Sequence, residues 1–291
     1  EGSKISNKDG NILEDLGNGK KRLLSYCGSA TEYSFTRDIA TSITEVADGA
    51  FVGSAVSSIT LRSGISWGTY PFDGLSLTSI DFNDVKDIPD YCLGKISFNG
   101  TLTIPKQIES IGDNAFFLSK ISAIEFEGDS NILTIGKYAF AHNTDLKSIS
   151  FGSGHSGCSC LIDEGAFFGC NKLSTITIDE SFVLTSIGDY AFAKCGNQKV
   201  SAPPTLNRTS DYDMFIPSSV VYVGKLAFSG IDRNSLDKNY PTQHPTRIAP
   251  STDGFKIAFE EDSMLMDLSE GSFAIGNLIK VDLSNCSKIE S

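Results

Sequence analysis

Cysteines, histidines and carboxylates are the side chains of this sequence that could carry chemistry. The 291 residues include seven cysteines and three histidines. Cysteine with histidine can bind zinc, and histidine or paired carboxylates can act in acid–base catalysis. One local cluster, His155, Cys158 and Cys160, supplies three ligands where a tetrahedral zinc site needs four. We expect an ordinary polar loop there, with a local disulfide as the alternative, and we predict no bound metal or cofactor.

The remaining candidate catalytic groups do not form a recognisable constellation. The histidines fall in expected loops, and the sequence has no Gly-x-Ser-x-Gly elbow, phosphate-binding loop, His-Glu-x-x-His motif or dinucleotide fingerprint. Many carboxylates lie at turn positions, such as Asp113, Asp163 and Asp189. Turn hydrogen bonding explains those residues better than acid–base work does. We therefore predict that the chain is not an enzyme.

Charge and composition narrow the classes of partner. Lys and Arg number 24, and Asp and Glu number 36, which gives a formal charge of −12. Nucleic acids and anionic lipids need clustered basic residues, so neither is expected as a partner. Apolar residues make up 40% of the chain, enough for a large core. No apolar run approaches the roughly 18 residues of a membrane-spanning helix, so we expect no direct membrane insertion.

The elements that position these side chains are copies of one short repeat. An Ile or Val, a small or polar residue, two variable residues and Ala-Phe recur along the chain. Six copies end in Ala50-Phe51, Ala115-Phe116, Ala139-Phe140, Ala166-Phe167, Ala191-Phe192 and Ala227-Phe228, and degraded copies end in Phe72, Leu93 and Phe273. Successive anchors are 21, 21, 23, 24, 27, 25, 36 and 45 residues apart. Most of these intervals match the roughly 20–29 residues of a leucine-rich-type coil.

A second pattern of apolar residues follows each anchor and predicts a strand. After Phe167, for example, come Leu173, Ile176 and Ile178, which end in the period-2 alternation of a strand with one buried face. Units this short bury their apolar side only by stacking, with their strands paired in parallel. We expect the anchor phenylalanines to form an internal column, and the Ala-Phe segment to be a helical or 3₁₀ turn. The Gly after Ile would permit a tight turn or a close contact, and Asp163 at that place indicates that positive φ is not required.

The repeat divides the chain into two parts. Residues 1–34 form an N-terminal segment whose residues 11–27 read as a β-hairpin that could cap the first coil. Residues 35–291 form a solenoid of about nine coils, with insertions near 196–213 and 232–254. At its end, Leu283 to Ile289 repeats the pattern of Phe82 to Ile88 and opens a new unit. We therefore expect a truncated C-terminus.

Four cysteines occupy repeat positions. Cys170 and Cys195 stand where other units have Asn143 and Ser119, and Cys92 replaces an anchor Ala. With Cys286, these residues are expected to be buried structural thiols. The sequence leaves open whether disulfides form among Cys158, Cys160, Cys170 and Cys195.

The repeat resembles the BspA-type leucine-rich repeat family over residues 35–291. The copies that carry the resemblance are Ile104-Pro105 to Ala115-Phe116, Ile216-Pro217 to Ala227-Phe228, and Ile187-Gly188 to Cys195. The resemblance implies a leucine-rich repeat solenoid, either an α/β-type horseshoe or a right-handed superhelix, with short parallel strands joined by turns or short helical segments. It also implies an extracellular or cell-surface protein that adheres to host proteins or to other cells.

Two sets of residues are candidates for partner binding. The first is the outward residue of each strand, expected on the concave face of the solenoid: Thr60, Asp81, Thr103, Glu125, Ser150, Thr177 and Asp282. The second lies in the insertions, where Tyr212, Tyr240 and His244 could contact a partner. We predict a protein-binding or adhesion module whose partners include host extracellular-matrix proteins. The alternative is a structural spacer that displays another domain and has no ligand of its own.

Overall fold

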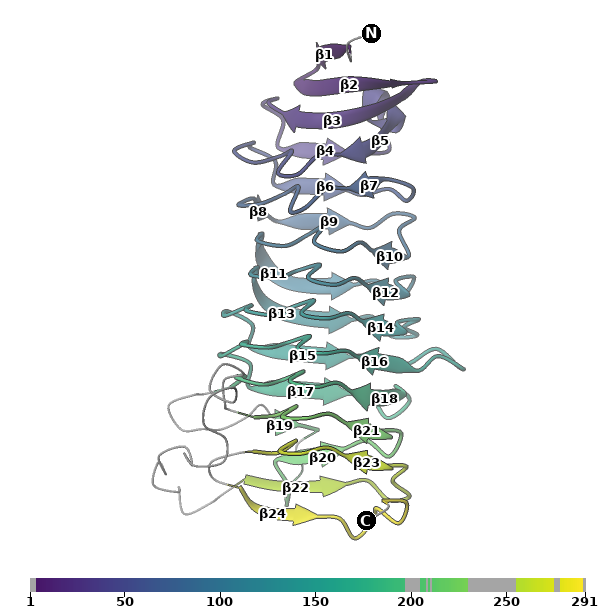
Figure 1. Ribbon diagram of the computed structural model, residues 1–291, viewed down its shortest axis with the longest axis vertical. Coiled ribbons are helices and arrows are strands. Elements are labelled where there is room, and N and C mark those ends of the chain that lie inside the picture. Colours follow the sequence, from purple (N-terminus) through teal and green to yellow (C-terminus); the bar gives the residue numbers. More distant parts are fainter. Residues whose placement is uncertain are drawn as a thin grey trace.

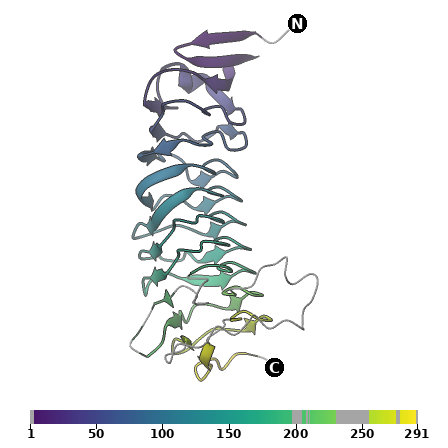
Figure 2. The ribbon, with the colours of Figure 1, turned by 90° about the vertical axis from the view of Figure 1, so that its left-hand side faces the viewer.

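The computed structural model is a parallel β-solenoid of about nine turns (Figure 1). It describes residues 4–196, 205–207, 209, 211–229, 255–274 and 278–289. The coils stack along one long axis, with β1 at one end and β24 at the other (Figures 1 and 2). This stacking confirms the predicted arrangement of short repeat units.

Two parallel sheets run along most of the stack. In hydrogen-bonded order, the nine-stranded sheet consists of β24 (Leu278–Asp282), β22 (Phe255–Phe259), β20 (Met214–Ile216), β19 (Thr205–Leu206), β17 (Thr175–Ile178), β15 (Ser148–Phe151), β13 (Lys120–Phe126), β11 (Ser97–Ile104) and β8 (Ser76–Leu77). The seven-stranded sheet consists of β10 (Asp87–Ile88), β12 (Ser110–Ile111), β14 (Thr134–Ile135), β16 (Cys160–Ile162), β18 (Leu184–Ile187), β21 (Tyr222–Val223) and β23 (Asp267–Leu268). From Ala115-Phe116 onward, each Ala-Phe segment lies between a strand of the seven-stranded sheet and the next strand of the nine-stranded sheet in the sequence.

Two smaller sheets form the N-terminal part of the stack. One contains β4 (Glu32–Ser34), β6 (Ser58–Thr60) and β9 (Ser79–Asp81), all parallel. The other contains β1 (Ile5–Lys8), β2 (Asn11–Gly17), β3 (Lys20–Tyr26), β5 (Ile43–Val46) and β7 (Ser66–Trp67). β2 and β3 pair antiparallel, which confirms the predicted hairpin, and β3 then pairs in parallel with β5.

The anchor phenylalanines form the predicted column inside the stack. Ring centroids are 4.8 Å apart for Phe116 and Phe140, 5.2 Å for Phe140 and Phe167, and 5.1 Å for Phe167 and Phe192. The rings of these pairs are within 4° of parallel, and Phe116, Phe140 and Phe167 are fully buried. From Phe116 to Phe192, one ring per coil at the spacing of hydrogen-bonded strands makes a continuous aromatic column, whereas Leu93 takes the anchor place in the coil before Phe116.

The Ala-Phe segment is a hydrogen-bonded turn, so of the two expected forms, a turn or a short helical segment, the structure has the turn. Among the described residues the one helical element is the 3₁₀ helix η1 (Asp38–Ser42). From Phe51 to Phe192, left-handed residues lie two places before and two places after each anchor, for example Tyr138 (φ 53°) and His142 (φ 59°) around Phe140. Only three residues separate them, and this is too short a stretch for i to i−4 helical hydrogen bonds. The α/β form of the fold is therefore not found.

The glycine that follows Ile serves close packing between coils. Its φ is not in the left-handed region in Gly112, Gly136, Gly188 or Gly224. A Cβ on Gly136 would lie 2.9 Å from the carbonyl oxygen of Ile111 in the preceding coil. Of the two predicted reasons for this glycine, close contact is the correct one.

Candidate binding surface

Four of the predicted binding residues lie side by side on the outer face of the nine-stranded sheet. Thr103 pairs with Glu125, Glu125 with Ser150, and Ser150 with Thr177. Thr103, Glu125 and Thr177 are exposed and Ser150 is half-buried, whereas their neighbours along each strand are buried. Backbone pairing thus fixes a row of three hydroxyl groups and one carboxylate at one strand spacing per step.

Thr60 and Asp81 form a separate row. They pair with each other in the three-stranded sheet, where Ser34 precedes them. β9, which carries Asp81, does not pair with β11, which carries Thr103. The predicted row is therefore two rows on different sheets.

The strand register adds residues that sequence reasoning missed. Thr101, Ala123, Ser148, Thr175 and Thr205 form a second outward row beside the first. The signal was available, because each strand with period-2 alternation has two outward positions and only one had been considered.

Phe215 was also missed, and it extends the first row toward the C-terminal coils. It pairs with Ala258, and Ala258 pairs with Asp282. This places Asp282 on the same sheet as Thr177, with a half-buried aromatic ring between them in the row. This register could not be predicted from the sequence, because the last two units are spaced irregularly.

Tyr212 and Asp282, predicted from separate arguments, meet in the structure. The Tyr212 hydroxyl donates to Asp282 Oδ2 at 2.9 Å, and Lys280 Nζ contacts both groups, at 3.1 Å and 2.9 Å respectively. The Tyr212 ring is stacked beside Phe215, with centroids 6.4 Å apart. Hydrogen bonding to Lys280 holds the pKa of Asp282 well below its usual range, and the same contact raises the pKa of Lys280 to about 12. The result is an ordered aromatic and charged cluster at the C-terminal end of the sheet.

The loop candidates Tyr240 and His244 lie outside the described residues.

His155, Cys158 and Cys160 have separate partners. His155 hydrogen-bonds Asp129 Oδ1 through Nδ1 at 2.8 Å, whereas Cys158 contacts Asn131 and Cys160 is buried. Among the described residues, no group of three His, Cys, Asp or Glu side chains converges on a possible metal position. The described part also contains no helix long and apolar enough to cross a membrane.

The repeat cysteines have structural contacts. Cys170 Sγ donates to the carbonyl of Phe140 and Cys195 Sγ to that of Phe167, as Asn143 Nδ2 does to Phe116. Burial raises the pKa of the Cys195 thiol, as does its contact with Cys170. All seven cysteines are free thiols, and Cys286 is only partly buried, contrary to expectation.

The turn carboxylates behave as predicted. Asp113 Oδ1 accepts the backbone N–H of Lys137 at 2.8 Å, and Asp189 Oδ1 accepts that of Lys225 at 2.8 Å. Asp163 accepts the N–H of its own neighbour, Glu164, at 2.6 Å. These carboxylates link consecutive coils or stabilise their own turns.

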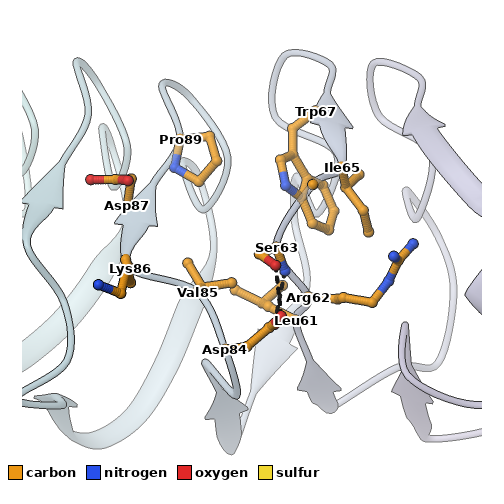
Figure 3. A pocket seen from close by; sticks show the side chains of 11 residues that line it. Leu61, Arg62, Ser63, Ile65, Trp67, Asp84, Val85, Lys86, Asp87 and Pro89 are labelled. Atoms are coloured by element: carbon orange, nitrogen blue, oxygen red, sulfur yellow. Dashed lines mark hydrogen bonds between the residues drawn. The ribbon is translucent and has the colours of Figure 1, made fainter.

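A cavity of about 360 Å³ opens between the coils that carry β7 and β10. Figure 3 shows Trp67 and Ile65 on one side of it, with Val85 and Pro89 on the other. Ser63 closes part of the rim by donating to Asp84 through both its backbone N–H and its hydroxyl. These hydrogen bonds hold the pKa of Asp84 below its ordinary value.

Similarity to two solved structures extends over nearly the whole chain. The chain is similar over its full length to a leucine-rich cell surface protein from Faecalibacterium prausnitzii A2-165, at 14% identity, a TM-score of 0.30 and 99% coverage of that chain. It is also similar to the pneumococcal vaccine antigen PcpA, at 13% identity and a TM-score of 0.32, with 99% of each chain covered. No curated protein matches the chain.

The family model supplies the assignment. The model of the BspA-type leucine-rich repeat region matches residues 20–147 and 134–232, in six copies. These residues include all six of the complete Ala-Phe units and both rows of the nine-stranded sheet up to β20. The chain therefore belongs to the BspA-type leucine-rich repeat family.

Proposed function

We propose that the chain is a non-catalytic, extracellular module that binds other proteins through the outer face of the nine-stranded sheet. The observation that carries this proposal is the row Thr103, Glu125, Ser150 and Thr177, held in register by backbone pairing. A rigid, repetitive surface presents its side chains at fixed spacing, so little conformational entropy is lost on binding.

The charge of this surface indicates the chemistry of the partner. Glu125 lies in the middle of the row, and the whole chain carries a formal charge of −12. A partner with a basic patch would be attracted to the face and oriented on it. Host extracellular-matrix proteins with basic segments, and adhesion to host cells, fit this description.

The proposal is tested with immobilised fibronectin and fibrinogen, using the whole chain and a Glu125→Lys/Thr177→Lys variant. We expect saturable binding by the natural chain and at least a tenfold loss in the variant, because both changes oppose a basic partner. Glu261→Lys, an exposed acid in a turn, is the matched control and should bind normally. Absence of saturable binding by the natural chain would leave the spacer role as the better explanation.

Two finer features of the fold form part of the same proposal. We propose that the hairpin of β2 and β3 caps the first coil, since Leu13, Leu23 and Tyr26 are buried whereas β1 is exposed throughout. We also propose that the chain divides into an N-terminal segment with the hairpin, residues 1–34, and the repeat solenoid, residues 35–291. A horseshoe-like curvature, with the binding rows on its concave side, remains a prediction.

A further inference from the structure

Strand pairing along the stack breaks at two places: between the five-stranded and the seven-stranded sheet, and between the three-stranded and the nine-stranded sheet. The five-stranded sheet ends at β7 and the seven-stranded sheet begins at β10, although these strands belong to consecutive coils. Residues 4–196 are all described, and within them no backbone hydrogen bond joins 62–67 to 85–89. The cavity beside Trp67 lies at this break (Figure 3).

A proline accounts for the break. In neighbouring coils the residue after the short strand donates its N–H to the preceding coil: Gly68 to Val46, Gly112 to Ile88 and Gly136 to Ile111, at 2.7–2.8 Å. Pro89 occupies this place after β10 and has no N–H to donate. The carbonyl of Trp67 therefore lacks the partner that the other coils provide.

The cavity offers an apolar interior and open strand edges. Its walls include Ile65, Trp67, Val85 and Pro89. Most polar groups at its rim already have partners: Ser63 with Asp84, Lys86 with Glu109, and Asp87 with Ser110. Arg62 donates through Nη2 to the Ile43 carbonyl, whereas its buried Nε has no hydrogen-bond partner. Backbone groups, apolar side chains and the Arg62 Nε–H are thus what remains to recognise a ligand, and about 360 Å³ is within the usual size of a ligand site.

The charged residues at the rim of the cavity indicate which charge its ligand should carry. Asp84 and Asp87 line the opening and are exposed, and Asp90, also exposed, follows the lining residue Pro89. Of the two cations in the lining, Arg62 is half-buried, and Lys86 is paired with Glu109 at 2.7 Å, so the acids outnumber the bases. The rim is therefore acidic. A basic ligand is attracted to it, and an acidic ligand is repelled.

We propose that this cavity is a second binding site, which accepts an extended peptide segment of a partner protein with a bulky apolar side chain between basic residues. The peptide backbone pairs with the open edge at β7 or β10, its apolar side chain enters the space beside Trp67, and its basic residues face the acidic rim. The site rests on the proposed protein-binding function but uses a different surface from the rows of the nine-stranded sheet.

Trp67 reports directly on this site because it is the single tryptophan of the chain. The whole chain is titrated with the peptide acetyl-Lys-Val-Phe-Val-Lys-amide while tryptophan fluorescence is followed. We expect a saturable change, and about tenfold to hundredfold weaker binding when the peptide Phe is replaced by Ala. A peptide with N-methylated backbone amides should also bind at least tenfold more weakly, because it cannot pair with a strand edge.

Variants of the chain locate the binding. Val85→Phe fills the cavity, and Pro89→Gly restores the residue found in other coils and the missing donor. Each should weaken peptide binding at least tenfold, and two variants are used so that a folding defect in one does not decide the result. Pro105→Glu is the matched control: Pro105 follows β11, where Glu127 follows β13 and donates to Ile104, so this change restores a donor at the other break and should leave binding unchanged.

The outcomes separate this site from the sheet surface. The proposal is overturned if the peptide gives no saturable change, or if folded Val85→Phe and Pro89→Gly chains bind it normally. The Glu125→Lys/Thr177→Lys variant should bind the peptide like the natural chain. Loss of matrix-protein binding in that variant with normal peptide binding supports both sites as independent, whereas loss of peptide binding contradicts the location proposed here.

Discussion

Tyr212 donates a hydrogen bond to Asp282 across 70 residues of sequence. The contact joins a residue of the predicted insertion near 196–213 to the last strand of the nine-stranded sheet, two coils further on. Because Lys280 bridges the same two groups, the three side chains form a closed set of contacts on the sheet surface. The C-terminal end of the candidate binding surface is therefore organised by side chains as well as by strand register.

Removing the Tyr212 hydroxyl should shift the titration of Asp282. The hydrogen bonds of Asp282 lower its pKa, so they stabilise the fold above its ordinary pKa of 3.8 and are lost as the pH falls through the lowered value. In Tyr212→Phe we expect the pKa of Asp282 to rise toward, but not reach, 3.8, because Lys280 and Ser284 remain. Carboxyl NMR titration measures this shift, and an unchanged pKa would show that the hydroxyl contributes nothing. Phe215→Leu is the control that leaves the hydroxyl in place.

Truncation of an anchor ring should be strongly destabilising. Phe140 is fully buried between the rings of Phe116 and Phe167. We expect Phe140→Ala to lower the free energy of unfolding by about 3–5 kcal/mol, through lost burial and the cavity that remains. Urea denaturation measures the change. Phe168→Ala, at a half-exposed ring one coil away, should cost far less, and equal losses would refute the role of the column.

The left-handed positions should discriminate sharply between glycine and alanine. Gly74 has φ 79°, and a Cβ there would meet nothing within 4 Å. Gly74→Ala should therefore lower the free energy of unfolding only by the cost of the left-handed conformation, about 1–2 kcal/mol. Gly74→Asn should lose less, since Asn tolerates this conformation. Thermal or urea unfolding of the three proteins tests the order Gly, Asn, Ala.

Alanine at the packing glycine should be worse than at Gly74, for a different reason. At Gly136 the backbone conformation suits any residue, but a Cβ would lie 2.9 Å from backbone atoms of Gly112 and Ile111. Coils would have to separate, so we expect Gly136→Ala to destabilise by roughly 2–4 kcal/mol, in the range of other packing defects. A loss smaller than that of Gly74→Ala would show that the coils yield easily at this contact.

The carbonyl of Phe116 accepts hydrogen bonds from its own turn, through the Ser119 N–H, and from the next coil. Asn143 Nδ2 supplies the second at 2.8 Å inside the core and also donates to the carbonyl of Phe140 at 2.9 Å. Asn143→Leu should cost about 1–3 kcal/mol because it removes both of these buried hydrogen bonds. Asn143→Cys should cost less, since Cys170 makes the same contact one coil later. Denaturant unfolding checks both, and equal losses would mean that the hydrogen bond is unimportant.

The sequence predicts the stacking well because the repeat encodes it directly. Ala139-Phe140 and its equivalents mark one coil each, and burial of every anchor ring follows from their spacing. The turn conformation could not be predicted in the same way. Tyr138 and His142 adopt left-handed φ, which their residue types do not favour, because their N–H groups donate to Glu164 and Phe168 in the next coil.

The candidate surface was predictable only where the repeat is regular. Glu125 and Thr177 follow from strand alternation and lie where expected. The contact between Tyr212 and Asp282 depends on a register set by insertions of irregular length, which alternation does not encode. The cavity at Pro89 depends on a missing N–H between coils, and its position becomes evident only when the coils are aligned in space.

The phenylalanine column also explains how a solenoid of this kind could change its length. Phe140 lies 4.8 Å from Phe116 and 5.2 Å from Phe167, the rings of the coils on either side of it. Duplicating one unit would lengthen the molecule by about one strand spacing while every junction keeps the same fit. Gain or loss of whole units can therefore change the length of the solenoid while the packing of the other units stays the same.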